Sequence, residues 1–245
     1  FLWIKQHTCS FCGKANDLFP GYLLAEDKRH PKNVFVCAAC GELKEAKDRE
    51  KPGKCNACGE RIRIEGPARR SKYLCKHCGK ENTFPGKQPK PPMHRMYAME
   101  YHCKKCKPTH EGRFYKKPGK SDLAKYAEAA ERLEMLLNSR VSGNDDQKGG
   151  RTFIPDDKIM EGDETARLHR WGYNYYREMF NARQLLGLEL SCRAISQVAD
   201  ERVRNALATN LSDLLRYQNM LCRYDSMALK SLDIFSVHGF PVGLV

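Results

Sequence analysis

Residues 9–13 read Cys9-Ser10-Phe11-Cys12-Gly13, and the same spacing of two cysteines occurs five times in the first 106 residues. Ten of the twelve cysteines fall into these pairs: Cys9/Cys12, Cys37/Cys40, Cys55/Cys58, Cys75/Cys78 and Cys103/Cys106. A glycine directly follows each of the first four pairs: Gly13, Gly41, Gly59 and Gly79. Sulfurs at this spacing suit a zinc tetrahedron when the backbone turns tightly, and glycine supplies the positive φ of that turn. The spacing therefore predicts at least two structural zinc ions, with these ten cysteines as candidate ligands.

The spacing leaves open which pairs share a metal ion. A sequential arrangement joins the first pair to the second and the third to the fourth. A nested arrangement joins the second to the third and the first to the fourth around them. The fifth pair, Cys103/Cys106, is left over in both cases. It has three expected fates, which are recruiting His102 or His110, using a partner chain, or staying free of metal.

Short apolar runs precede four of the five pairs, as strands precede the knuckles of a zinc ribbon. A front half with so little apolar core needs metal for much of its folding free energy. We therefore expect an α+β protein in which small zinc-ribbon β-hairpins are followed by an α-helical bundle. The expected regions are a multi-zinc-ribbon region at 1–118, a connecting helix and flexible linker at 119–165, and a helical domain at 166–245.

Apolar residues at helical spacing predict four helices in the second half. The first begins at Ser121 as N-cap and ends near Arg140, before a flexible loop at 142–150. The second covers 164–176. The third begins after Asn181 as N-cap, and the fourth covers roughly 201–219. In the fourth helix an apolar stripe is expected to face the core: Val203, Leu207, Leu211, Leu214 and Leu215.

The net charge of +13 lies in one part of the chain, because residues 61–120 contain 17 Lys and Arg against 4 Glu. Four thiolates around zinc carry a formal charge of about −2, so two centres absorb only part of this excess. The surplus predicts a surface for nucleic-acid phosphates. No apolar run is long enough to span a membrane, so no membrane partner is expected. Paired cysteines without a signal peptide favour a reducing, cytoplasmic setting.

Catalytic motifs are missing from the sequence. It has no glycine-rich dinucleotide fingerprint, no Gly-x-x-x-x-Gly-Lys-Ser/Thr loop, no nucleophile elbow and no zinc-deaminase signature. Centres with four sulfur ligands leave no open position for a catalytic water. The residues alone thus predict a structural, nucleic-acid-binding chain without catalytic or cofactor-binding residues.

Several stretches nevertheless resemble the adenine-specific DNA methyltransferases that contain a zinc ribbon. Residues 179–186, Met-Phe-Asn-Ala-Arg-Gln-Leu-Leu, are the most specific of them. The other stretches, in matching order and separation, are 65–79, 171–173 and 219–226. In that family, the corresponding region lies between the glycine-rich loop that holds S-adenosylmethionine and an Asp-Pro-Pro-Tyr motif that binds the flipped adenine.

Neither catalytic block occurs in this chain. In particular, Pro91-Pro92 is followed by Met93 and not by the aromatic residue of an Asp-Pro-Pro-Tyr motif. The resemblance thus implies the zinc-ribbon and helical insert of a larger α/β methyltransferase. The way the chain begins and ends also suggests a cut through a larger protein, or a chain ordered only in part. It implies DNA and the remaining methyltransferase core as partners, and S-adenosylmethionine as cofactor of the parent enzyme only. The chain alone is not expected to methylate. The resemblance also favours the nested pairing.

Nine polar residues are candidates for contacts with DNA. Strands of the ribbon are expected to present five of them to phosphates: Arg61, Arg63, Arg69, Arg70 and Lys72. The helical part is expected to supply Asn181, Arg183, Gln184 and Arg223, which can read base edges but are as often caps or ties between helices. Two other functions remain open: a stand-alone zinc-ribbon adaptor that binds nucleic acid, and a structural insert for oligomerisation.

Overall fold

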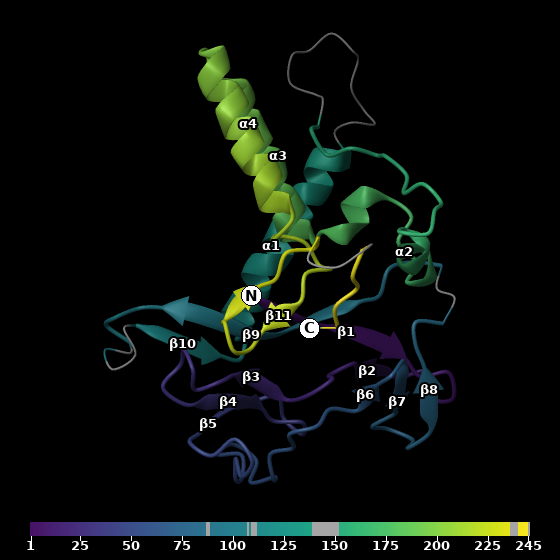
Figure 1. Ribbon diagram of the computed structural model, residues 1–245, viewed down its shortest axis with the longest axis vertical. Coiled ribbons are helices and arrows are strands. Elements are labelled where there is room, and N and C mark those ends of the chain that lie inside the picture. Colours follow the sequence, from purple (N-terminus) through teal and green to yellow (C-terminus); the bar gives the residue numbers. More distant parts are fainter. Residues whose placement is uncertain (87–88, 107, 109–111, 139–151, 236–239, 245) are drawn as a thin grey trace.

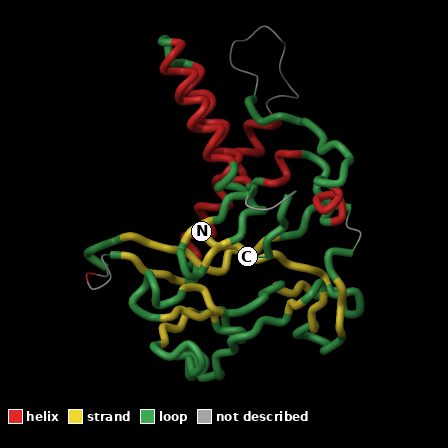
Figure 2. The backbone as a smooth tube through the Cα atoms, viewed as in Figure 1, coloured by secondary structure: helices red, strands yellow, loops and turns green. Residues whose placement is uncertain are grey.

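The computed structural model describes residues 1–86, 89–106, 108, 112–138, 152–235 and 240–244 of the 245-residue chain. The protein is a mixed α+β structure in which small antiparallel sheets lie on one side and the helices on the other (Figures 1 and 2). The expected loop at 142–150 lies outside the described residues. None of the helices in the described part of the chain has the length and apolar character needed to span a bilayer.

The largest sheet has the strand order β10-β9-β1-β2, and in Figure 1 it lies between the helices and the smaller sheets. Its strands are β1 (Leu2–Thr8), β2 (Ala15–Asp17), β9 (His94–His102) and β10 (Arg113–Lys116). Two smaller sheets have three strands each. One consists of β3 (Leu23–Ala25), β4 (Asn33–Val36) and β5 (Leu43–Ala46). The other consists of β6 (Ala68–Arg69), β7 (Lys72–Leu74) and β8 (Glu81–Thr83). A two-stranded ribbon of β11 (Tyr224–Asp225) and β12 (Lys230–Ser231) completes the set. The expected strands before the cysteine pairs are confirmed.

Helix α1 (Lys120–Asn138) confirms the first predicted helix, but it begins one residue before the expected Ser121 cap. Gly119 occupies the position before the helix, and its N–H donates to Asp122 Oδ2. Helix α3 (Ala182–Ser196) begins after Asn181 as predicted, and α4 (Glu201–Leu215) follows it after Asp200. The long helix predicted at 164–176 is wrong. A short α2 (Ala166–Arg170) and the 3₁₀ helix η2 (Tyr176–Met179) replace it, because Gly172 adopts φ 82° between them.

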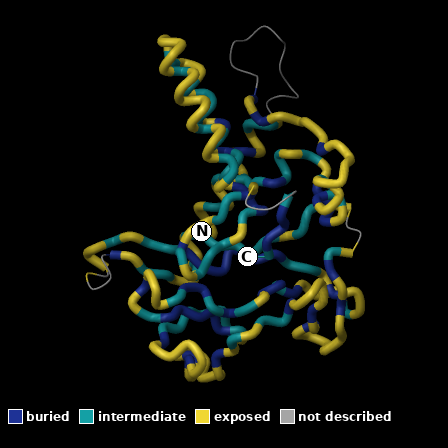
Figure 3. The backbone as a smooth tube through the Cα atoms, in the orientation of Figure 1, coloured by how far each residue is buried: buried dark blue, intermediate teal, exposed yellow. Residues whose placement is uncertain are grey.

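The prediction that α4 turns its apolar stripe inward is also wrong. No residue of α4 is buried, and Val203 and Leu207 are 49% and 40% exposed. Helices α3 and α4 form a hairpin that extends away from the sheets, and its surface is mostly exposed (Figures 1 and 3). Helical spacing indicates that an apolar stripe exists, but it does not supply a second layer to cover the stripe.

The largest hydrophobic cluster joins the front and back halves of the chain. It contains Cys9, Tyr73 and Cys75 from the cysteine-rich half together with Trp171, Tyr173, Met179 and Leu221 from the second half. The N–H of Lys5 donates to the carbonyl of Leu244 at 3.1 Å, so strand β1 and the last described segment lie side by side (Figure 1). The region boundaries near 118 and 165 stay a prediction, but the core is continuous across them.

Candidate metal centres and an arginine-lined cavity

Eight of the ten paired cysteines gather into two groups. The outer site consists of Cys9, Cys12, Cys75 and Cys78, and the inner site of Cys37, Cys40, Cys55 and Cys58. The spacing left the pairing open and the resemblance favoured nesting, and the structure shows the nested grouping. All four knuckle glycines have the expected positive φ, between 70° and 77°.

Local structure explains how each knuckle forms. In the outer site, Cys9 and Cys12 lie in the turn between β1 and β2, and Cys75 and Cys78 lie in the turn between β7 and β8. The N–H of each knuckle glycine donates to the carbonyl of the first cysteine, as Gly13 does to Cys9 at 2.9 Å. The first cysteine of each pair is buried, whereas the second is more open to solvent. The knuckles thus turn four sulfurs toward a common point.

The sulfur separations fit a tetrahedral metal ion. In the outer site, Cys9 Sγ lies 3.7 Å from Cys78 Sγ, and Cys12 Sγ lies 3.6 Å from Cys75 Sγ. The corresponding separations in the inner site are 3.6 and 3.7 Å. Zinc–sulfur bonds of about 2.3 Å in a regular tetrahedron place the sulfurs about 3.8 Å apart. Because all four sulfurs of each group also lie within 4.8 Å of one another, each group could hold one ion.

Hydrogen bonds favour the thiolate form, which binds metal, for one sulfur or more in each site. Burial raises the pKa of Cys9, but the N–H groups of Phe11 and Cys12 and the side chain of Asn82 lower it to about 6 overall. In the inner site, the N–H groups of Cys58 and Ala57 outweigh burial and lower the pKa of Cys55 to about 7. Each site therefore contains at least one thiol with a depressed pKa.

Two buried asparagines cross-link the outer site. Asn16 Nδ2 donates to Cys75 Sγ at 3.5 Å, and its Oδ1 accepts from the N–H of Lys76 at 2.9 Å. Asn82 makes the equivalent bonds to the opposite knuckle: its Nδ2 donates to Cys9 Sγ at 3.4 Å, and its Oδ1 accepts from the N–H of Ser10 at 2.8 Å. The prediction from sequence missed them. The signal was a repeat, Cys-x-x-Cys-Gly-Lys-x-Asn, which occurs at 9–16 and again at 75–82.

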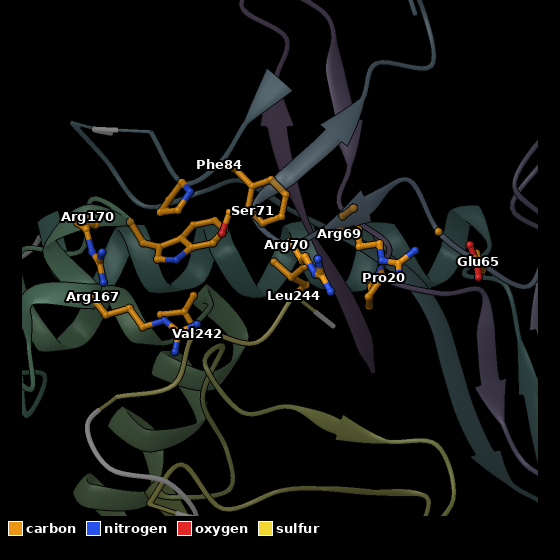
Figure 4. A pocket seen from close by; sticks show the side chains of 14 residues that line it. Pro20, Glu65, Arg69, Arg70, Ser71, Phe84, Arg167, Arg170, Val242 and Leu244 are labelled. Atoms are coloured by element: carbon orange, nitrogen blue, oxygen red, sulfur yellow. The ribbon is translucent and has the colours of Figure 1, made fainter. Parts of the chain in front are cut away.

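A cavity of about 640 Å³ (Figure 4) shares Ala68, Phe84 and Trp171 with the hydrophobic cluster that contains Cys9 and Cys75 of the outer site. Four arginines line it, Arg69 and Arg70 from the β6–β7 hairpin and Arg167 and Arg170 from the region of α2. Glu65 lies at one edge of the cavity, away from Arg167 and Arg170 (Figure 4). Within the described residues, none of the four arginines forms an ion pair. The lining thus holds four guanidinium groups against one carboxylate, that of Glu65, and keeps an excess of positive charge.

Backbone strain helps to place one of these arginines. Arg70 and Ser71 form the two-residue loop between β6 and β7, with φ of 48° and 64°. Such loops normally use Asn-Gly, because side chains at positive φ cost free energy. The strained Arg70 lies at the cavity (Figure 4). On α2, Arg167 and Arg170 are three residues apart and so share one face, while Leu168 between them is fully buried.

The other predicted nucleic-acid residues have different surroundings. Lys72 pairs with Glu81 at 2.7 Å, and Arg61 and Arg63 are exposed near the inner site, away from the cavity lining. Asn181 and Gln184 form a reciprocal cap on α3, with hydrogen bonds of 3.0 and 2.9 Å. The structure therefore gives these two residues the capping role, and base reading by them stays a prediction.

A second cavity, of about 290 Å³, contains Arg183, Arg223 and the caps of α3, together with two residues that the sequence did not single out. Lys5 is only 2% exposed, and its Nζ donates to the carbonyl of Met220 at 2.9 Å. Burial lowers the pKa of Lys5 to about 7. Burial and the charge of Lys5 lower the pKa of the adjacent His94 to about 3. A lysine in a strand is normally expected to be exposed to solvent, so nothing in the sequence indicated that Lys5 is buried beside His94.

The fifth pair lies apart from both sites. Cys103 and Cys106 follow β9 at the tip of the β9–β10 hairpin, and no group of three or more ligands among the described residues includes them. His110, one of its expected partners, lies outside the described residues.

Comparison with known proteins found no matching family model, no matching curated protein and no matching solved structure.

Proposed function

We propose that this chain is a zinc-stabilised, DNA-binding region. The single observation that carries the proposal is the arginine-lined cavity. Guanidinium groups bind phosphate oxygens through paired hydrogen bonds, and four unpaired ones around one cavity suit a phosphate backbone. Zinc in the two four-cysteine sites would fix the hairpins that carry Arg69 and Arg70. Because thiolates need a reducing compartment, the proposal places the protein in the cytoplasm.

We further propose that the parent protein is an adenine-specific DNA methyltransferase. The four stretches that resemble this family pack together in one hydrophobic cluster through Tyr73, Trp171, Met179 and Leu221. The N–H of Met220 also donates to the carbonyl of Met179 at 2.7 Å, which ties two of these stretches directly. Residues that resemble a family and also form one packed unit support a shared architecture better than scattered matches would.

The division of labour follows from what the chain contains. It supplies phosphate contacts and a rigid frame, whereas the parent's S-adenosylmethionine loop and Asp-Pro-Pro-Tyr motif would supply methyl transfer. Phosphate contacts position a protein on the duplex but carry no sequence information. The target sequence would therefore be read elsewhere, with Arg223 and Arg183 as the candidates in this chain.

Salt-dependent DNA binding tests the first proposal. Fluorescence anisotropy with duplex DNA should show affinity that falls as salt rises, because phosphate contacts release counterions. Arg69→Ala/Arg70→Ala should weaken binding for all sequences and make the slope of log K against log salt shallower by roughly 1 per lost contact. Lys125→Ala/Arg132→Ala removes the same charge from the exposed face of α1 and should leave the slope unchanged. Equal slopes in the two double variants would place the DNA surface elsewhere.

Methyl transfer tests the second proposal separately. The complete gene product should transfer a labelled methyl group from S-adenosylmethionine to adenine N6 in DNA, and this chain alone should transfer none. A complete product that binds DNA without methylating it would remove the enzyme assignment and leave the DNA-binding role. That result would favour the stand-alone adaptor.

A further inference from the structure

The fifth cysteine pair shares with the four pairs of the metal sites the N–H groups that point at the first sulfur, although no glycine follows its second cysteine. In the outer site, the N–H groups two and three residues after Cys9 point at its sulfur. The N–H groups of Lys105 and Cys106 are directed at the Cys103 sulfur in the same way, and the two thiols are within hydrogen-bonding reach of each other. The N–H of Cys103 bonds across a wider turn than in the other knuckles, to the carbonyl of Gly112 at 2.6 Å, whereas the N–H of Cys9 bonds to the carbonyl of Lys14. This turn is therefore a formed knuckle that offers two sulfurs to one ion.

The knuckle supplies only half of a coordination shell. Zinc with thiolate ligands takes four ligands in structural sites. Among the described residues, no histidine, cysteine or carboxylate brings a third ligand atom to Cys103 and Cys106. The other four knuckles form the two internal sites, and in each site two knuckles supply two sulfurs each.

The position of the pair makes a facing knuckle available only from outside the chain. Strands β9 and β10 pair up to His102 and Arg113, and the knuckle lies beyond that last pair at the projecting end of the hairpin (Figure 1). Cys106, Lys104 and Lys105 are exposed there. A second copy can present the same exposed cysteine pair, and two such pairs supply four sulfurs, the number that each internal site uses.

Charge also fits this arrangement. Two facing tips would bring Lys104 and Lys105 of each chain together, which is unfavourable without a counter-charge. A zinc ion with four thiolates carries a formal charge of about −2 and offsets this repulsion. Without metal the tips should repel each other, so association should depend on the ion.

We propose that Cys103 and Cys106 form half of a zinc site that a second copy of this chain completes, so that one ion bridges two hairpin tips. The four cysteine thiols lose their protons on binding, and no oxidation or reduction is involved. This inference rests on the proposed zinc binding of the internal sites. It adds a metal-dependent dimer to the DNA-binding role.

Zinc stoichiometry and mass test the proposal together. The protein is measured in reducing buffer by elemental analysis and analytical ultracentrifugation, with zinc added and after treatment with a mild chelator. Wild type should contain five zinc ions for every two chains and sediment with twice the chain mass. Cys103→Ser/Cys106→Ser should lose the shared ion and sediment as a monomer with two ions per chain. Cys192→Ser/Cys222→Ser removes two cysteines outside the knuckles and should behave like wild type.

A wild-type monomer with three zinc ions would overturn the proposal, because the knuckle would then be completed within its own chain. A monomer with two ions would overturn it as well, because the knuckle would bind no metal. A tip variant with fewer than two ions per chain would instead contradict the internal sites, so the two failures are distinguishable.

Discussion

The outer and inner sites each have four cysteine ligands and the same sulfur separations, but the residues around the two sites differ. Cys9 and Cys75 of the outer site belong to the large cluster that includes Trp171 and Leu221 from the far end of the chain. The inner site packs against a small cluster of its own, with Phe35, Ala46 and Ile62. The buried asparagines Asn16 and Asn82 tie the knuckles of the outer site together. At the inner site, by contrast, the hydrogen bonds from Lys44 Nζ to Asn56 Oδ1 and from Lys117 Nζ to the carbonyl of Cys40 are exposed. Equivalent metal chemistry can therefore support the whole fold or only a local loop.

The largest difference should appear when one ligand of each site is replaced. Cys75→Ser should loosen the outer site together with the core around Trp171, because the ion and the core share residues. Structural zinc contributes about 10–16 kcal/mol in small zinc-binding peptides, so the loss should exceed the stability of a typical domain. Cys55→Ser, the matched change in the inner site, should disorder only the segment near residues 33–64. Hydrogen exchange resolved by residue measures both effects.

Equal loss of protection throughout the chain in both variants would contradict this comparison. A loss confined to residues 1–86 in Cys75→Ser would show instead that the second half folds without the outer site. That result would restore the separable regions expected from the sequence.

The second prediction concerns Lys5, which follows Ile4 on the strand that leads into the outer site. Its pKa is about 7 in the folded protein, compared with 10.5 for an unperturbed lysine. Between these values the unfolded chain binds more protons than the folded chain, so stability should rise with pH from about 7 to 10. Below about 7 the cost of burying the charged lysine is fully present.

Lys5→Met should remove this contribution. We expect the free energy of unfolding of wild type to increase by a few kcal/mol relative to Lys5→Met across this window, since each unit of pKa shift is about 1.4 kcal/mol. Chemical denaturation at fixed free zinc measures it. Parallel pH profiles in the two proteins would show that Lys5 keeps an ordinary pKa and is not desolvated as the structure indicates.

The smallest predicted effect concerns the asparagines of the outer site. Asn16→Ala or Asn82→Ala removes a donor to a ligand sulfur and a bond to the opposite knuckle. Loss of such supporting hydrogen bonds typically lowers metal affinity 10–100-fold. Asn56→Ala, beside the inner site, should have little effect because its hydrogen bond is exposed. Competition with a chromogenic chelator measures the affinities, and equal values for all three variants would remove the proposed role of Asn16 and Asn82.

Local features were predictable from sequence because local chemistry determines them. The positive φ of Gly13 and the cap at Asn181 follow from a tight turn and from an unsatisfied helix end. The nested pairing could not be derived from spacing, because both arrangements satisfy the same knuckles. Long-range placement was also out of reach. Nothing in the sequence near Arg167 shows that it shares a cavity with Arg70, or that Lys5 is covered by residues more than two hundred positions later.

The most direct test of two nested four-cysteine zinc centres uses the Cys103→Ser/Cys106→Ser variant, in which the fifth pair cannot contribute. Elemental analysis combined with X-ray absorption at the zinc edge should give two ions per chain, each with four sulfur neighbours at about 2.3 Å. Fewer than one ion per chain, or mass spectra showing these eight cysteines joined as disulfides, would contradict the account.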